Sequence, residues 1–233
     1  MTYTLVTANR NYSSWSLRPW ILMNALDIPF EDEIVYFEAE NYERFRKFAP
    51  NAQVPCLKDR DREGNVSTIW DSLAIIEYLA ERHAGCWPVE DGARAWARCA
   101  SAEMHGGFSA LRNQCPMNVG VRARMHDIDK SLQRDIDRIS ELFAEGVDRF
   151  GGPWLAGESL SAVDAFFAPV AFRVRSFDLD IGAAGKIWVD HMISHPAMQE
   201  WEAEALAEPL REIGHEEEIA ASATILQDFR AAV

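Results

Sequence analysis

The feature that most constrains the fold of this chain is Val54-Pro55, at the start of the apolar run Pro55-Cys56-Leu57-Lys58. Proline has no backbone N–H, and the bond before a proline can be cis at modest cost. We expect a cis bond here, because it would turn the N–H and C=O of Val54 outward. Groups exposed in this way can pair with an extended peptide, as a short added strand would. The sequence therefore predicts a strand whose entry is open to a peptide ligand.

The pair Asp71-Ser72 stands just before a second apolar run, Leu73-Ala74-Ile75-Ile76-Glu77-Tyr78-Leu79. Asp and Ser are typical caps of a helix, and the free N–H groups of a helix start bind a carboxylate. The Asp71 carboxylate can meanwhile hold an ammonium group. Together with the strand entry at Val54, these groups predict a pocket for a small zwitterionic peptide.

The pattern of apolar residues up to about residue 83 predicts the element order βαβαββα. Because Pro19 cannot donate to the carbonyl of Trp15, we expect the first helix to begin near Ser16. A polar turn at Asp61-Arg62-Glu63-Gly64-Asn65 predicts a hairpin between the third and fourth strands. The expected strands cover residues 2–7, 33–37, 55–58 and 66–69, and the expected helices cover residues 16–26, 42–48 and 73–81.

A segment with Gly85, Pro88 and Gly92 then reads as a linker. Everything after it is predicted to be helical, with Ser161 starting one helix and Asp164 reaching back as a shortened capping box. We therefore predict an α/β domain over residues 1–83 and an all-helical bundle over residues 92–233.

The charge balance excludes some partners. The chain has 233 residues, a net charge of −14 and an isoelectric point near 4.8, which argues against nucleic acid. Residues 1–83 carry 9 basic and 13 acidic side chains, and residues 84–233 carry 14 and 24. The less acidic N-terminal part is therefore the better host for an anionic ligand. The cluster Glu216-Glu217-Glu218 is interpreted as a solvated face. No apolar run is long enough to span a bilayer, so we expect no membrane partner.

Metal binding is not expected. The four cysteines lack the spacing of a metal site, and His191 and His195 lack a Glu or Cys partner to complete one. Reduced thiols are typical of the cytoplasm, which is the compartment that we expect. The four cysteines are Cys56, Cys86, Cys99 and Cys115.

Three serines, Ser13, Ser14 and Ser16, stand where the first strand turns into the first helix. A helix start stabilises an anion by about 0.3–1 kcal/mol when exposed, and by more when partly buried. A free thiol has a pKa near about 8.5, and a hydroxyl that donates to its sulfur would lower that pKa. The serines could therefore stabilise the thiolate of a ligand. The alternative is that they only cap the helix.

Four segments in this order resemble motifs of the glutathione transferases. Three of them resemble glutathione-site motifs, and the serine run is most similar to that of the zeta class, which includes maleylacetoacetate isomerases. The fourth resembles the capping motif of the family's helical domain. The segments are Ser13-Ser14-Trp15-Ser16-Leu17-Arg18, Gln53-Val54-Pro55, Asp71-Ser72-Leu73-Ala74-Ile75 and Ser161-Ala162-Val163-Asp164.

The resemblance implies a thioredoxin-like domain followed by a helical domain, with glutathione as co-substrate and no metal. It implies a cytoplasmic homodimer that transfers glutathione to a hydrophobic or acidic electrophile. It also assigns roles to residues. The implied thiolate-stabilising residues are Ser13 and Ser14, with Ser13 favoured because it lies five positions before Arg18. The implied glutathione-binding residues are Gln53, Val54, Pro55, Asp71 and Ser72, and the implied second-substrate pocket contains Trp15, His105, Phe108 and Arg112.

Two other functions remain open for such a chain. One is glutathione-dependent cis–trans isomerisation of a maleylacetoacetate-type diacid. The other is a non-catalytic interaction module on the same fold, which need not keep the serine or the site for the γ-glutamyl end. Both of these features are present in the sequence, which favours an enzyme.

Overall fold

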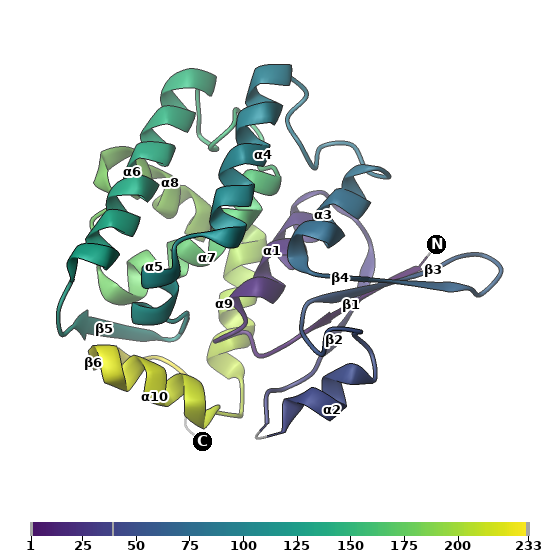
Figure 1. Cartoon of the computed structure of the whole chain (residues 1–233), viewed down its shortest axis with the longest axis horizontal. Helices are drawn as coiled ribbons and strands as arrows, with labels where there is room; N and C mark the ends of the chain where they lie inside the picture. Colours follow the sequence, from purple (N-terminus) through teal and green to yellow (C-terminus); the bar gives the residue numbers. More distant parts are fainter. Residues whose placement is uncertain (1, 39, 232–233) are drawn as a thin grey trace.

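A four-stranded mixed sheet forms the N-terminal part of the computed structural model, which describes residues 2–38 and 40–231 (Figure 1). The strand order is β2-β1-β3-β4, with β1 parallel to β2 and antiparallel to β3. The predicted order βαβαββα is confirmed. The elements are β1 (Thr2–Thr7), α1 (Ser14–Ala25), β2 (Phe30–Ile34), α2 (Asn41–Arg46), β3 (Cys56–Arg60), β4 (Val66–Trp70) and α3 (Ser72–Ala80).

The expected boundaries in this part differ from the structure by up to three residues, and two of the differences have an identifiable cause. Strand β2 was expected at residues 33–37, but it lies at Phe30–Ile34, where Tyr3 pairs with Phe30 and Thr7 with Ile34. The strand ends at Ile34, although Val35 N still donates to Thr7 O at 2.9 Å, and Val35 packs against a small cluster of Val6, Ala49 and Cys56. Pairing with β1 therefore fixes the position of this edge strand, and its own hydrophobicity does not.

Helix α1 begins two residues earlier than expected. Its N-cap is Ser13, and Leu17 N donates to Ser13 O at 3.2 Å. Pro19 lies inside the helix and removes a single N–H from its bonding pattern. Because this loss falls near the helix start, the first turn still forms, and it brings Ser14 into the helix.

Helices form most of the remaining chain. The structure confirms the capping box at Ser161 and Asp164, and this capping box lies at the start of α7. The helices are α4 (Asp91–Gly106), α5 (Ser109–Gln114), α6 (Lys130–Phe150), α7 (Ala162–Phe177), α8 (Gly182–Ser194), α9 (Pro196–Ala207) and α10 (Ile213–Ser222).

The helical part also contains a two-stranded antiparallel sheet, so the expectation that everything after the linker is helical was wrong. It is formed by β5 (Val121–Met125) and β6 (Ala223–Asp228), which lie about a hundred residues apart in the chain. In β5 the buried Val121 and Ala123 alternate with Arg122 and Arg124. This alternation is a strand signal, but it is short and adjoins helices on the sequence.

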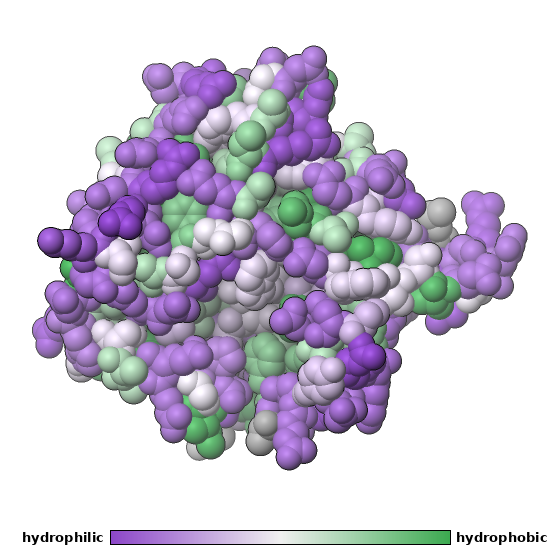
Figure 2. Space-filling view, in the orientation of Figure 1, coloured by the Kyte–Doolittle hydropathy of each residue, from purple (hydrophilic) through white to green (hydrophobic). Residues whose placement is uncertain are grey.

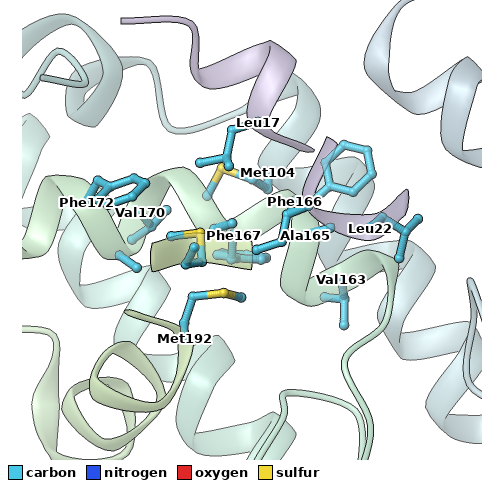
Figure 3. Packing of buried hydrophobic residues seen from close by; sticks show 14 of the residues in the cluster. Leu17, Leu22, Met104, Val163, Ala165, Phe166, Phe167, Val170, Phe172 and Met192 are labelled. Carbon is cyan, nitrogen blue, oxygen red and sulfur yellow. The ribbon is translucent and has the colours of Figure 1, made fainter. Parts of the chain in front are cut away.

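The core is built around α7, which is buried over almost its whole length. Helix α1 of the N-terminal part packs on it. Figure 3 shows Leu17 and Leu22 of α1 gathered with Val163 and Phe166 of α7 in this core. Burying side chains of this size stabilises a fold by roughly 1.5–3 kcal/mol each. The shared core fixes the start of α1 against the helical part. In the described residues, no helix has the length and apolar character needed to cross a membrane.

Candidate functional site

A cavity of about 500 Å³ lies between the sheet and the helical part, at the start of α1. In Figure 2 a hollow opens near the centre of this face of the molecule. Its volume falls within the range of roughly 300–1,000 Å³ that is typical of small-molecule sites. Both parts of the chain contribute to its lining. The lining residues are Tyr12, Ser13, Ser14, Trp15, Phe37, Asn41, Phe45, Asn51, Ala52, Gln53, Val54, Pro55, Asp71, Ser72, Arg112, Pro116, Met117, Arg173, His215 and Glu218.

The two serines at the start of α1 differ in their hydrogen bonds. Ser13 is buried, and its hydroxyl donates to Ser16 Oγ at 2.7 Å. Ser16 Oγ in turn accepts from Ala8 N at 3.3 Å. The Ser14 hydroxyl has no hydrogen bond to the described residues, and the side chain is half-buried on the cavity. Of the two, Ser14 therefore has the hydroxyl that is free to donate to a ligand.

The loop before α1, residues 8–13, is held by the end of the helical part. Glu208 accepts from Arg10 N, and it also accepts from Asn11 N at 3.1 Å. Trp201 Nε1 donates to Arg10 O at 2.9 Å. Burial raises the pKa of Glu208, and the hydrogen bonds from Arg10 and Asn11 offset only part of this rise. The helical part thus fixes the loop that carries Tyr12 and Ser13 into the cavity.

A second group of contacts holds Tyr12. Its hydroxyl donates to Glu216 Oε1 at 2.7 Å, and Glu216 also binds Arg230 and accepts from Asn118 Nδ2 at 3.1 Å. Burial and the bond to Glu216 raise the pKa of Tyr12. The interpretation of Glu216-Glu217-Glu218 as a solvated face is therefore wrong for Glu216. This carboxylate is paired because the strand β6 returns Arg230 to it.

An aromatic stack closes the same end of the cavity. His215 of α10 lies between Tyr12 and Phe37, with ring centroids 4.9 Å and 5.3 Å away and an interplanar angle of 22° in both pairs. Its Nδ1 lies 2.6 Å from Glu212 Oε2. Residues from the loop before α1, from the loop after β2 and from α10 thus form one surface.

The expected cis bond between Val54 and Pro55 is confirmed. Val54 lies on the cavity with Gln53 and Pro55. Neither its N–H nor its C=O makes a hydrogen bond to the described part of the chain. The cavity therefore has one peptide unit that can bond to an extended ligand.

Asp71 and Ser72 lie at the start of α3, on the same cavity. Asp71 Oδ1 accepts from Leu73 N at 2.8 Å, so the expected helix cap is confirmed. Its backbone has a φ of 74°, a conformation that is costly for residues other than glycine and often found at functional sites. Its Oδ2 faces His105 Nε2 at 3.5 Å. Ser72 is buried, and its hydroxyl accepts from Arg18 Nη1 at 3.5 Å.

Trp15 is flanked by two guanidinium groups. The Cζ atoms of Arg18 and Arg112 lie 4.1 Å and 4.7 Å from its ring centroid. Burial lowers the pKa of Arg18 strongly, and the nearby Arg112 and Arg173 add to this effect. Burial also lowers the pKa of Arg112, and it lowers that of Arg173 to about 10. Three guanidinium groups thus gather at the α5–α7 side of the cavity.

Two residues expected in the second-substrate pocket lie behind its surface. Phe108 is buried in the core, where its ring packs edge-on against Phe167 at 6.4 Å. His105 packs edge-on against Trp15 at 5.3 Å, and burial lowers its pKa. Trp15 and Arg112, which the resemblance assigns to the same pocket, line the cavity.

Several lining residues were not predicted as site residues. Tyr12 and Phe37 adjoin predicted segments but belong to no motif. His215 and Glu218 come from a helix more than 200 residues after the first strand, and no local pattern links them to it. Arg173 lies on α7, and no motif of the sequence places it in the site.

The remaining reactive groups point to no further chemistry in the site. Among residues 2–38 and 40–231, no group of three or more His, Cys, Asp or Glu side chains is arranged to hold a metal ion. Cys115 is buried, and burial raises the pKa of its thiol to about 12. A thiol of this kind does not ionise at neutral pH.

Two family models match the chain. The glutathione S-transferase N-terminal domain matches residues 12–82, and the glutathione S-transferase C-terminal domain matches residues 122–204. Together they cover more than half of the 233 residues.

Individual proteins are similar at low identity. The chain is 24% identical over 198 residues to the glutathione S-transferase-like protein OpS6 of Beauveria bassiana, covering 78% of this chain and 88% of that protein. It is 26% identical over 179 residues to a probable maleylacetoacetate isomerase of Vibrio cholerae, covering 72% and 80%. A crystal structure of a glutathione transferase homolog from Burkholderia, with bound glutathione, matches with a TM-score of 0.65 at 19% identity, covering 88% of this chain and 98% of that one. At this identity the structural match shows a shared fold.

Proposed function

The chain belongs to the glutathione S-transferase family, and on this premise we propose that it binds glutathione and transfers it to an electrophilic small molecule. The observation that carries the proposal is the convergence of three groups on one cavity. These are the serine hydroxyl at the start of α1, the free peptide unit of Val54 and the capped start of α3 at Asp71.

In the proposed complex, each part of glutathione meets a group of matching chemistry. The cysteinyl backbone pairs with Val54, beside Gln53 and Pro55. The γ-glutamyl carboxylate binds at the start of α3 near Ser72, and its ammonium binds the Asp71 carboxylate. The thiol then lies at the start of α1.

Ser14 is the proposed donor to the sulfur, with Ser13 as the alternative. A hydrogen bond from its hydroxyl favours the thiolate over the thiol, and the thiol proton leaves to solvent. The sulfur then forms a bond to the electrophilic carbon, and the leaving group departs with its electron pair. The serine itself forms no covalent bond.

Three finer features are proposed with this function. The chain acts as a homodimer, it works in the cytoplasm, and its reaction is transfer, with isomerisation of a maleylacetoacetate-type diacid as the alternative. Assays with aryl halides, organic peroxides and maleylacetone, each with glutathione, separate transferase, peroxidase and isomerase activities.

Calorimetry with Asp71→Asn tests the binding mode. Asparagine can still accept from Leu73 N and cap α3, but it lacks the charge that holds the ammonium. We expect glutathione affinity to fall at least tenfold, which is about 1.4 kcal/mol.

The matched control for this substitution is Asp129→Asn. Asp129 caps α6 by accepting from Ser131 N and Leu132 N, and it is not part of the cavity. This variant should bind glutathione as the wild type does. Equal affinity in Asp71→Asn and the wild type would mean that Asp71 only caps its helix.

A further inference from the structure

His215 of α10 is fixed in the cavity wall by contacts to its ring faces and to one of its nitrogens. Its ring stacks against the rings of Tyr12 and Phe37. Its Nδ1 lies 2.6 Å from Glu212 Oε2. The part of the ring that is left open is therefore the edge that carries Nε2. This nitrogen has no hydrogen bond to the described residues, and His215 lines the cavity.

Glu212 holds His215 from the start of the same helix. Its Oε2 accepts from His215 N at 2.8 Å and faces Nδ1, so one carboxylate oxygen contacts both the backbone and the ring. Burial raises the pKa of Glu212, but the hydrogen bonds from His215 outweigh it, so the pKa lies below its ordinary value of 4.5. A carboxylate beside one ring nitrogen keeps a proton on that nitrogen and leaves the other nitrogen to exchange a proton with a ligand.

The aromatic stack joins His215 to the loop that carries the proposed thiol donor. Tyr12 precedes Ser14 by two residues, and Ser14 N donates to Tyr12 O at 2.8 Å. The Tyr12 hydroxyl donates at 2.7 Å to Glu216, the residue after His215 in α10. Because the proposed thiolate lies at the start of α1, the Nε2 edge of His215 adjoins the end of the cavity where sulfur and electrophile meet.

The other polar groups at this end of the cavity are less able to give up a proton. The Tyr12 hydroxyl donates to Glu216. The Ser13 hydroxyl donates to Ser16. Guanidinium groups keep their protons at neutral pH, and carboxylic acids lose theirs well below it. Histidine is the side chain that exchanges a proton near pH 7, and of the six histidines, all within the described residues, His215 is the one that lines the cavity.

We propose that His215 donates a proton to the second substrate and that Glu212 positions it for this role. This inference rests on the proposed function and concerns electrophiles that must take up a proton. When the thiolate sulfur bonds to the β-carbon of an α,β-unsaturated ketone, the electron pair of the C=C bond moves toward the carbonyl group and forms an enolate. Nε2–H gives its proton to the α-carbon of the enolate, and solvent returns a proton to Nε2. The net reaction adds the S–H of glutathione across the C=C bond.

An aryl halide needs no such proton. The sulfur replaces the halogen on the ring, and the halide departs as an anion with the bonding electron pair. Both reactions need the thiolate, but only the addition to the unsaturated ketone needs a proton on the electrophile. The two electrophiles therefore separate proton donation from thiolate formation.

The test compares the conjugation of glutathione to benzylideneacetone, an unsaturated ketone, and to chlorodinitrobenzene, an aryl halide. The measured quantity is the ratio of kcat/KM for the ketone to kcat/KM for the halide. Because a positioned proton donor contributes about 10²–10⁴-fold, we expect His215→Gln to lower this ratio at least tenfold. Glutamine keeps a polar side chain at this position but cannot give up a proton. The matched control is His126→Gln, at an exposed histidine outside the cavity, which should leave the ratio unchanged.

Glu212→Gln tests the positioning role. The glutamine carbonyl can still accept from His215 N and cap α10, but it carries no charge beside Nδ1. We expect the ratio to fall in this variant, and to fall no further when Glu212→Gln is added to His215→Gln. A further fall in the double variant would show that Glu212 does not act through His215, and would overturn its positioning role.

The outcomes separate this inference from the proposed function. An unchanged ratio in His215→Gln overturns the inference whatever happens to either rate alone, because a residue that only supports the glutathione site affects both reactions alike. If the wild type conjugates the halide but not the ketone, the inference is overturned and the proposed function stands. If the wild type conjugates neither electrophile and does not bind glutathione, the proposed function fails, and the inference fails with it.

Discussion

The choice between Ser13 and Ser14 depends on a hydrogen bond that no spacing reveals. Counting back from Arg18 favours Ser13, and that preference came from the resemblance to a family. In the structure Ser13 donates to Ser16, whereas the Ser14 hydroxyl has no partner in the described residues. The sequence thus predicts that a serine at this turn faces the cavity. Which of the two can donate depends on the packing of Ser16 beneath the loop.

Replacing Ser14 with alanine should separate thiol activation from ligand binding. We expect the pKa of the bound glutathione thiol to rise by about one unit, because a donor worth about 1.4 kcal/mol to the thiolate is lost. Conjugation at neutral pH should slow by roughly tenfold, while glutathione affinity stays within about twofold. Ultraviolet titration of the bound thiolate measures the pKa directly.

Ser13→Ala is the natural control for this experiment. It removes the hydrogen bond to Ser16 but leaves the proposed donor in place, so the thiol pKa should change less than in Ser14→Ala. The reverse order would assign the role to Ser13. If neither variant changes the titration, the helix start alone stabilises the thiolate.

At the scale of elements, local sequence patterns predicted most helices and strands of the N-terminal part. They failed for strands whose pairing partner lies far away in the sequence. The hairpin of β3 and β4 has its turn in the sequence, and α3 has its cap at Asp71. Strand β2 is placed by β1, against its own apolar run. Strand β6 is placed by β5, about a hundred residues earlier in the chain. Neither partner strand lies close enough in the sequence for a local pattern to reveal the pairing.

The unpredicted strand β6 has a structural role at the cavity. It returns the chain so that Arg230 pairs with Glu216 of α10, and Glu216 holds Tyr12 beside Ser13. We call α10, β6 and Arg230 the C-terminal clasp. Because an acidic run is usually a solvated face, the sequence alone could not identify Glu216 as a half-buried partner of Arg230 and Tyr12.

The clasp should make stability depend on pH in a defined window. Burial raises the pKa of Glu216, but the hydrogen bonds from Arg230 and Tyr12 outweigh it, so the pKa lies below its ordinary value of 4.5. The unfolded chain therefore binds more protons just below pH 4.5, and stability rises with pH there. The contribution of Glu216 is fully present above about pH 4.5 and is lost as pH falls through the folded-state pKa.

Glu216→Gln tests the predicted direction of this change of stability with pH. Above about pH 5 we expect the free energy of unfolding of the variant to be about 1–3 kcal/mol lower than that of the wild type, since a charged hydrogen-bond partner is lost. The difference from the wild type should shrink at lower pH. Urea denaturation at a series of pH values measures it, with Glu217→Gln as the matched neighbour. A difference that stays constant down to pH 3 would show that Glu216 does not titrate in this way.

At the scale of the whole molecule, the sequence predicted two parts and one half of their shared cavity. The predicted groups of the N-terminal half come from short motifs, because Ser14, Val54 and Asp71 lie at or next to the start of a helix or strand. Tyr12 and Phe37 line the same half without belonging to a motif. The other half comes from Arg173, His215 and Glu218, whose positions depend on how the helical part packs against α1. The proposed second substrate would be selected by that half of the cavity, so the motifs do not reveal its identity.

The proposed homodimer leads to a prediction for the outer edge of the sheet. Strand β4 is an edge strand, and its Val66 and Trp70 are 44% and 43% exposed. Apolar side chains on an edge invite association, and a two-fold dimer that packs this domain on the partner's helical part would cover them. Trp70→Glu places a charge in that contact, so we expect its dimer dissociation constant to rise at least tenfold in light scattering across a concentration series. Ile187→Glu, at an exposed position of α8 (67%), should leave the dimer intact. A wild type that is monomeric at micromolar concentration would exclude the dimer, and a dimer equally stable in both variants would place its contact away from β4.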